Sequence, residues 1–414
     1  MHNTLPTSDN RSISPHAHGL ALHARPPLLS TRGWAGFLIA LIAVCALAPA
    51  LNLALPENSA LHLSDYMLGL LGKIMCYAIC ALAIDLIWGY AGILSLGHGV
   101  FFALGGYVMG MYLMREAAGP DGLPPFMGFL DWHALPWHWG LSGSFVATLV
   151  LVVAVPGLLA CVLGYFAFRS RIKGVYFSII TQAMTYAAML LFFRNETGFG
   201  GNNGFTGFIR ILGEPLNTPH MRVALFVLTG IALLGLFLLA RWLVRSKYGR
   251  VLQAIRDAES RTMFCGYNPL PYKLSIWVIS AMMCGVAGAL YVPQVGIINP
   301  SEMGTVNSIE MAIWVAVGGR GTLVGPVLGA FLVNGGKSWL TVATPEYWLF
   351  VLGALFILVT LFMPSGIVGV WRERRQKREQ ETLLVRAHAP HPGARARNES
   401  ARKEATSTVQ GAHA

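Results

Sequence analysis

The chain has 414 residues, of which 55% are hydrophobic and only 12% are charged, and its mean hydropathy is +0.56. This composition excludes an ordinary soluble protein and indicates several membrane-spanning helices. The net charge of +11 does not indicate nucleic-acid binding, because the basic residues cluster between apolar segments and in the C-terminal tail, as the positive-inside rule describes.

The two ends of the chain differ in composition from the part between them. Residues 1–33 are polar and lack the continuous apolar core of a signal peptide, so they predict a disordered cytoplasmic tail. Residues 34–370 form the predicted membrane domain. Residues 371–414 are rich in Arg, Ala, His and Pro and predict a basic, largely disordered cytoplasmic tail.

Apolar segments follow one another through the membrane domain and predict an all-α polytopic membrane protein of about ten transmembrane or partial helices. They cover roughly residues 34–55, 66–88, 93–114, 142–168, 174–193, 223–244, 273–292, 308–318, 322–341 and 346–370. The segment 308–318 is too short for a full span and predicts a half-helix or a re-entrant piece.

The distribution of Lys and Arg predicts the orientation of these segments. With alternating sides, most basic residues fall on the side of the two termini. The opposite loops contain only Arg115, Arg194, Arg210 and Arg222. The positive-inside rule therefore predicts that the N- and C-termini are both cytoplasmic.

Two glycine-rich breaks interrupt the apolar pattern, one in each half of the chain. Residues 88–110 read WGYAGILSLGHGVFFALGGYVMG, and residues 317–331 read VGGRGTLVGPVLGAF. Irregular backbone at membrane depth is tolerated where protein or a water-filled cavity surrounds it, and paired breaks point to a transport pathway. The candidate pathway residues in the first break are Ser95, Gly97, His98 and Gly99. Plain helix packing through small residues is the alternative.

Five ionisable residues fall within or beside apolar segments, where a charge is costly without a partner. They are Lys73, Asp85, Glu302, Glu310 and Lys337.

The segment 245–273 is a basic, amphipathic loop between two apolar segments. Tyr248, Leu252 and Ile255 recur at helical spacing on one side, and Gly266 is placed to end the helix. The other predicted contact residues of this loop are Gly249, Arg250, Arg256, Asp257 and Glu259. Such a helix can lie on a membrane or in a groove of a partner, and its mixed charge favours a protein partner.

No motif for catalysis, a metal or a nucleotide accompanies these features. Gly336-Lys337-Ser338 resembles the end of a phosphate-binding loop, but Phe331 stands where that motif needs glycine. We therefore expect no catalytic residue, no metal site and no cofactor bound by this chain.

The chain resembles the permease subunits of ATP-binding-cassette (ABC) importers for branched-chain amino acids and urea. The similar stretches are GYAGILSLGHGVFFALGGY, RSRIKGVYFSIITQAMTYA, GRVLQAIRDAESRTMFCGYNP, AGALYVPQVGIINPSE and VAVGGRGTLVGPVLGAF. The segment LLFFRNETGFGGNNGFTGF (190–208) is most similar to the urea type. The resemblance implies a multi-pass permease in the bacterial inner membrane, paired with a second permease subunit, two ATPase subunits that use ATP, and a periplasmic solute-binding protein. It also implies that the 245–273 loop docks on an ATPase as the coupling helix.

Urea is the expected substrate, and branched-chain amino acids are the alternative. A neutral polar solute such as urea needs hydrogen-bonding groups, so Gln182, Asn202 and Asn203 join the candidate pathway residues. A stand-alone channel or secondary transporter is the third hypothesis, and it predicts uptake without an ATPase.

Overall fold

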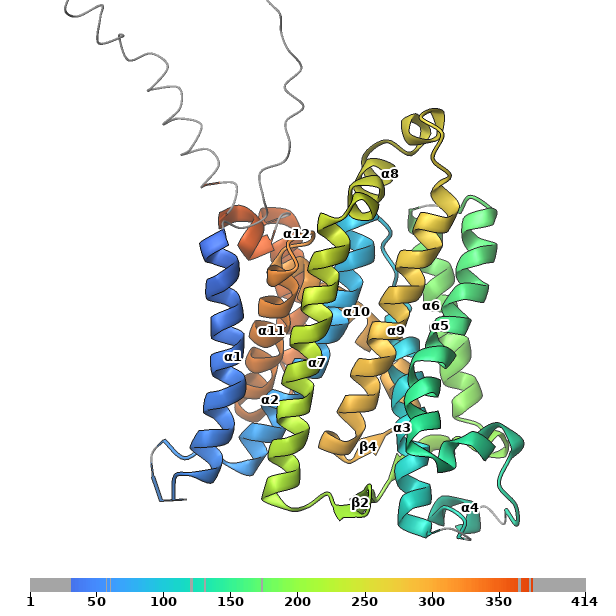
Figure 1. Cartoon of the computed structure of the whole chain (residues 1–414), viewed down its shortest axis with the longest axis vertical. Coiled ribbons are helices and arrows are strands. Elements are labelled where there is room, and N and C mark those ends of the chain that lie inside the picture. The colour runs from blue at the N-terminus through green and yellow to red at the C-terminus, as the bar shows by residue number, and fades with distance from the viewer. Residues whose placement is uncertain are drawn as a thin grey trace, which may run out of the picture.

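The computed structural model describes residues 31–371 and residue 374, apart from 57, 60, 120, 121, 130, 131, 173, 364 and 365. The two predicted disordered tails lie outside these residues, except for residues 31–33 of the first tail and residues 371 and 374 of the second. The helices run roughly parallel in one bundle (Figure 1).

A helix occupies each of the predicted apolar segments. The long helices are α1 (Thr31–Leu53), α2 (Asp65–Asp85), α3 (His98–Ala118), α5 (Phe145–Arg169), α6 (Val175–Phe192), α7 (Pro219–Arg245), α9 (Pro269–Val295), α10 (Thr305–Gly318), α11 (Val324–Ala343) and α12 (Trp348–Phe362). Among the described residues, six helices are long and apolar enough to cross a membrane, namely α1, α2, α5, α6, α7 and α9. This confirms the prediction of a helical protein with several membrane spans. The predicted number of about ten transmembrane or partial helices is not confirmed.

Short elements were not expected in an all-α chain. The helix α4 covers Pro125–Phe129, and η2 (Trp137–Gly143), η3 (Asn195–Thr197), η4 (Gly201–Asn203) and η5 (Pro300–Met303) are single 3₁₀ segments. The two-residue strands are β1 (Phe205–Thr206), β2 (Arg210–Ile211), β3 (Glu214–Pro215) and β4 (Ile297–Ile298). β1 pairs antiparallel with β4, and β2 with β3. These pairs close the loops at the end of the bundle where α7 begins (Figure 1).

The centre of the bundle is α9, which packs against α2, α3 and α5. Glycines allow the close approach of α3 and α9, because a Cβ on Gly105 would clash with the backbone of Gly285, and one on Gly288 with the backbone of Phe102. α5, α6 and α7 expose many large apolar side chains on the outside of the bundle. This surface suits lipid contact.

The amphipathic loop forms α8 (Lys247–Phe264) at one end of the bundle, beyond α7 and α9 (Figure 1). The side chain of Ser246 caps its start by accepting a hydrogen bond from the Gly249 amide at 3.4 Å. Gly266, at φ +86°, follows its end, as predicted. The sequence did not indicate the kink at Ala258, whose backbone is non-helical.

The first residues of α1 and the end of α12 lie at the same end of the bundle as α8 (Figure 1). The first and last described segments therefore lie on the side of the 245–273 loop. The cytoplasmic placement of that side remains a prediction from charge.

Candidate functional site

The two glycine-rich breaks meet in the structure. The buried carboxylate of Asp85, at the end of α2, accepts hydrogen bonds from the amides of Gly321 and Leu323, the latter at 3.0 Å. Tyr90 donates its hydroxyl to the Gly321 carbonyl at 3.0 Å. A Cβ on Gly89 would clash with Gly321. The chain after α2, which forms the π-helix η1 (Leu86–Tyr90), is therefore joined directly to the loop between α10 and α11.

The helix α8 is attached to the first of these breaks. The Arg256 guanidinium donates a short hydrogen bond to the Gly89 carbonyl, and its aliphatic stem fills the space beside Gly92, where φ is +73°. Leu252 and Ile255 are each only 2% exposed. The apolar side of α8 is therefore covered by the chain itself.

Further contacts fix α8 to the start of α9. The Tyr248 hydroxyl lies 2.6 Å from the Ser275 hydroxyl, and the Tyr248 ring stacks on Tyr272. Lys273 pairs with Glu259 at 2.7 Å. Burial raises the pKa of Tyr248, so this hydroxyl stays protonated at neutral pH. Together these contacts attach α8 firmly to the adjoining end of α9.

The predicted contact residues of α8 thus fall into two groups. Tyr248, Gly249, Leu252 and Ile255 face the chain's own membrane domain, which corrects the expectation that the apolar stripe lies in a partner's groove. Three of the predicted contact residues, Arg250, Asp257 and Gly266, are exposed. Other exposed residues of this loop include Arg261, Met263, Phe264 and Tyr267. Phe264 is the most exposed of its large apolar side chains, at 93%. Sequence spacing could not identify it, because it lies after the kink.

His98, the predicted polar residue of the first break, is fully buried at the start of α3. Its Nε2 lies 2.8 Å from the Ser280 hydroxyl, which donates to the Ala83 carbonyl at 2.6 Å. Nε2 therefore carries the proton, because the Ser280 hydroxyl hydrogen is already engaged. The Trp277 ring packs edge-on against the imidazole. These contacts tie α3 to α9 and α2. A role of His98 in the pathway stays a prediction.

The neighbours of His98 also make packing contacts. Ser95 is buried and accepts a hydrogen bond from the Gly97 amide at 3.2 Å. A Cβ on Gly97 would clash with Thr181 of α6. A Cβ on Gly99 would clash with the Ser308 hydroxyl. None of the cavities described below is lined by these residues. Their role in a pathway stays a prediction.

The three remaining pathway candidates are dispersed. Gln182 is half-buried on α6, and Asn202 and Asn203 are exposed on η4, close to the paired strands. The structure does not gather these amides around His98, and they too stay predictions.

The bundle contains two adjoining cavities that the sequence did not locate. One has a volume of about 520 Å³ and the other of about 230 Å³, and Tyr66, Leu70, Lys73 and Ser338 line both. The ion pair of Asp65 with Arg222, at 2.9 Å, stands at the wall of the larger cavity, where α2 and α7 begin. The larger cavity therefore opens toward the end of the bundle opposite α8.

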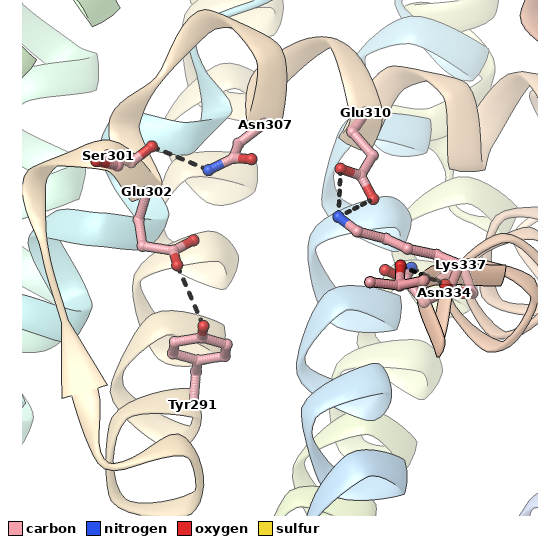
Figure 2. Close-up of polar contacts among 9 residues, drawn as sticks. Tyr291, Ser301, Glu302, Asn307, Glu310, Asn334 and Lys337 are labelled. Atoms are coloured by element: carbon pink, nitrogen blue, oxygen red, sulfur yellow. Dashed lines mark hydrogen bonds and ion pairs between the residues drawn. The ribbon is translucent and has the colours of Figure 1, made fainter. Parts of the chain in front are cut away.

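Two of the charged residues that the sequence marked as needing partners, Lys73 and Lys337, line these cavities. Glu302 and Glu310 line neither cavity but lie within electrostatic range of Lys73. Glu310 of α10 pairs with Lys337 of α11 at 2.9 Å, and Glu302 accepts a hydrogen bond from the Tyr291 hydroxyl at 3.2 Å (Figure 2). The sequence identified these residues one by one. It did not show that they lie together, because they come from separate segments.

A model of the family described as branched-chain amino acid transport system / permease component matches residues 66–360. The chain belongs to this permease family. It is a multi-pass membrane protein and a permease subunit of the ABC importer type, as the sequence predicted. The matched range contains both glycine-rich breaks, α8 and both cavities.

Relatives of this permease agree with the family assignment. It is 25% identical over 325 residues to the high-affinity branched-chain amino acid transport system permease protein LivM of Escherichia coli, covering 72% of this chain and 69% of LivM. It is 27% identical over 305 residues to the permease protein BraD of Pseudomonas aeruginosa, covering 71% and 91%. The ribose import permease protein RbsC of Escherichia coli is 21% identical over 55% of this chain and 71% of its own length. No solved structure matches the permease.

Proposed function

We propose that this permease forms part of the translocation pathway of an inner-membrane importer that takes up branched-chain amino acids. Its partners are a second permease subunit, two ATPase subunits that hydrolyse ATP, and a periplasmic solute-binding protein. The observation that carries the proposal is the attachment of α8 to the first glycine-rich break through Arg256 and Gly89. This contact joins α8, which the charge distribution predicts to be cytoplasmic, to the irregular backbone within the bundle.

The surface that receives force from the ATPase is the exposed end of α8. Phe264 projects beyond the kink, and Met263, Tyr267 and Arg261 beside it are exposed. An aromatic anchor with an arginine beside it is typical of the energetic centre of a protein interface. The buried contacts of Leu252 and Ile255 hold the helix to the membrane domain, so a push on Phe264 is transmitted inward.

The force continues along identified contacts. A displaced α8 pulls on the Gly89 carbonyl through Arg256, and the segment around Gly89 is joined through Asp85 to Gly321. Both breaks, and with them the ends of α2 and α11, move together. We propose that this movement opens and closes the cavities, because both are lined by residues of α2 and α11 that lie away from the junction.

The substrate assignment differs from the expectation of urea. LivM and BraD are permeases for branched-chain amino acids, so the comparisons favour that type of cargo over urea. Urea remains the second candidate, because residues 190–208 resemble the urea type. In the structure this segment includes η3, η4 and the strand β1, which pairs with β4 next to η5 and Glu302.

Uptake by the complete transporter tests the proposal. The permease, its genomic neighbours and the binding protein are reconstituted in proteoliposomes with or without internal ATP, and uptake of leucine and of urea is measured. We expect ATP-dependent uptake of leucine. ATP-dependent uptake of urea without uptake of leucine would show that urea is the substrate, and it would leave the assignment as an ABC importer unchanged. Uptake by this chain alone, without ATP, would overturn the proposed function.

A further inference from the structure

The two adjoining cavities meet at Lys73. The residue lies on α2, about two turns inside the Asp65–Arg222 ion pair. It lines the larger cavity, which reaches the opening, and the smaller one, which lies against α11. A solute that enters from the side opposite α8 therefore meets the Lys73 ammonium.

The Lys73 ammonium has no ion-pair partner within 4 Å among the described residues. Its Nζ lies 5.7 Å from the centre of the Tyr77 ring and 5.8 Å from that of Tyr291. Contact with aromatic faces offsets part of the cost of the buried charge, but within the described part of the chain it leaves the N–H donors of the ammonium without an acceptor. By contrast, the nearby Lys337 is paired with Glu310.

An acceptor lies at the hydroxyl end of Tyr291. Glu302 accepts a hydrogen bond from the Tyr291 hydroxyl, so its carboxylate lies beyond the ring whose face Lys73 approaches. Glu302 is within electrostatic range of Lys73. A donor over the face of the Tyr291 ring and an acceptor at its hydroxyl end thus lie near each other, and no ion pair within 4 Å joins them among the described residues. Figure 2 shows Glu302 above Tyr291 and, separately, Glu310 with Lys337.

Two buried polar groups near Tyr77 and Glu302 also lack a partner among the described residues. The Trp314 indole nitrogen makes no hydrogen bond within the described residues although Trp314 is 2% exposed, and its ring lies 4.8 Å from that of Tyr77. The Tyr107 hydroxyl, which is in electrostatic range of Glu302, is also buried and makes no hydrogen bond within the described residues. Buried donors without acceptors are costly, so their presence here indicates a region that takes a polar guest.

We propose that Lys73 and Glu302 are the two ends of a transient solute-binding site in the pathway. Lys73 binds an oxygen acceptor, and Glu302 accepts N–H groups. This chemistry is shared by the carboxylate and ammonium of an amino acid and by the carbonyl and amides of urea. A sugar has no N–H group and matches the site poorly. The inference rests on the proposed function and specifies the recognition step within it.

A cysteine placed in the cavity tests this site. Ser338 lines both cavities and is replaced by Cys in the complete transporter, with the exposed Cys161 and Cys265 changed to Ser. The rates of modification by an anionic and a cationic methanethiosulfonate are compared. We expect the anionic reagent to be favoured and the ratio of the two rates to fall about tenfold in Lys73→Met. Arg241→Met is the control, because Arg241 lies over the Trp34 ring and lines neither cavity.

Solute protection tests the recognition chemistry. L-leucine, urea and D-ribose are added separately during modification of Ser338→Cys. We expect leucine or urea to slow modification, ribose to have no effect, and the protecting concentration to rise at least about tenfold in both Lys73→Met and Glu302→Gln. Lys73→Arg, which keeps the charge, should retain most of the protection.

Three outcomes would overturn the site. The first is a reagent ratio that is the same in Lys73→Met as in the protein with Lys73. The second is protection by ribose as strong as that by leucine and urea. The third is no protection by any of the three solutes. Failure of the proposed function has a different signature, since it abolishes ATP-dependent uptake while the charge dependence at Ser338→Cys remains.

Discussion

The carboxylate of Asp85 accepts a hydrogen bond from the backbone amide of Gly321, 236 residues further along the chain. The side chain is fully buried, and its second oxygen accepts from the Leu323 amide. A single carboxylate therefore satisfies two amides of a loop that has no regular structure. Because irregular backbone at membrane depth needs such partners, Asp85 makes the second glycine-rich break possible.

Replacing Asp85 by Asn tests this dependence. The amide keeps the size of the carboxylate but turns one acceptor into a donor that faces a backbone N–H. We expect a loss of about 1–3 kcal/mol in the free energy of unfolding, and a lower apparent melting temperature of the purified complex. Asp257→Asn is the control, because Asp257 is exposed on α8. Equal melting temperatures for both variants would contradict the role of Asp85.

The close approach of the two breaks predicts a position-specific effect of alanine. A Cβ on Gly89 meets the backbone of Gly321 and the Asp85 carboxylate, whereas a Cβ on Gly235 of α7 meets nothing within 4 Å. We expect Gly89→Ala to lower both stability and ATP-dependent uptake. Gly235→Ala should be neutral or stabilising by up to about 1 kcal/mol, because alanine favours helix. Thermal unfolding and uptake of the two variants, measured side by side, check this.

Much of the fold could be predicted from the sequence because membrane helices depend on local composition. The apolar segments, the short α10 and the end of α8 at Gly266 all coincide with elements of the structure. The kink at Ala258 and the pairing of β1 with β4 could not be predicted. Both depend on contacts between distant segments, which hydrophobic periodicity does not record.

The site was harder to predict for the same reason. His98 was selected because it is polar, and the structure shows that its hydrogen bond to Ser280 joins helices. Lys73 and Glu302 were noticed as costly charges, but only the fold places both beside Tyr291. The apolar stripe of α8 was correctly identified as a face to be buried. Its partner is the chain itself, because Leu252 and Ile255 are covered within the permease.

The two sides of α8 should respond differently to a negative charge. Leu252→Asp buries a charge without a partner, so we expect it to destabilise the permease by several kcal/mol and reduce its yield. Phe264→Asp changes an exposed side chain, so we expect a normal yield and melting temperature but at least about tenfold weaker binding of the ATPase. Co-purification of the ATPase with each variant checks this. Full ATPase binding by the Phe264 variant would contradict the assigned docking surface.

The loop at the opposite end of the bundle should be sensitive to acid. His138 packs against Phe199, its buried Nε2 has no hydrogen-bond partner among the described residues, and burial lowers its pKa. Below the ordinary histidine pKa of about 6.5, the unfolded loop binds a proton that the folded loop resists. The stabilising contribution is therefore complete above this pH and declines as the pH falls through it.

Limited proteolysis of the loop containing η2 at pH 7.5 and at pH 5.5 measures this effect. We expect faster cleavage at pH 5.5 in the wild-type protein and a smaller difference between the two values in His138→Phe. Equal pH dependence of the two proteins would assign the acid sensitivity to another group.

The ion pair of Glu310 and Lys337 should show strong coupling between its members. The Glu310 side chain is only 4% exposed, so Lys337→Met leaves a buried carboxylate without its cation. We expect this single change to destabilise the permease by about 3–5 kcal/mol. Adding Glu310→Gln removes the unpaired charge, so the double variant should be more stable than Lys337→Met alone. Thermal unfolding of the wild type, both single variants and the double variant gives the coupling energy, and additive effects would show that the two side chains act independently.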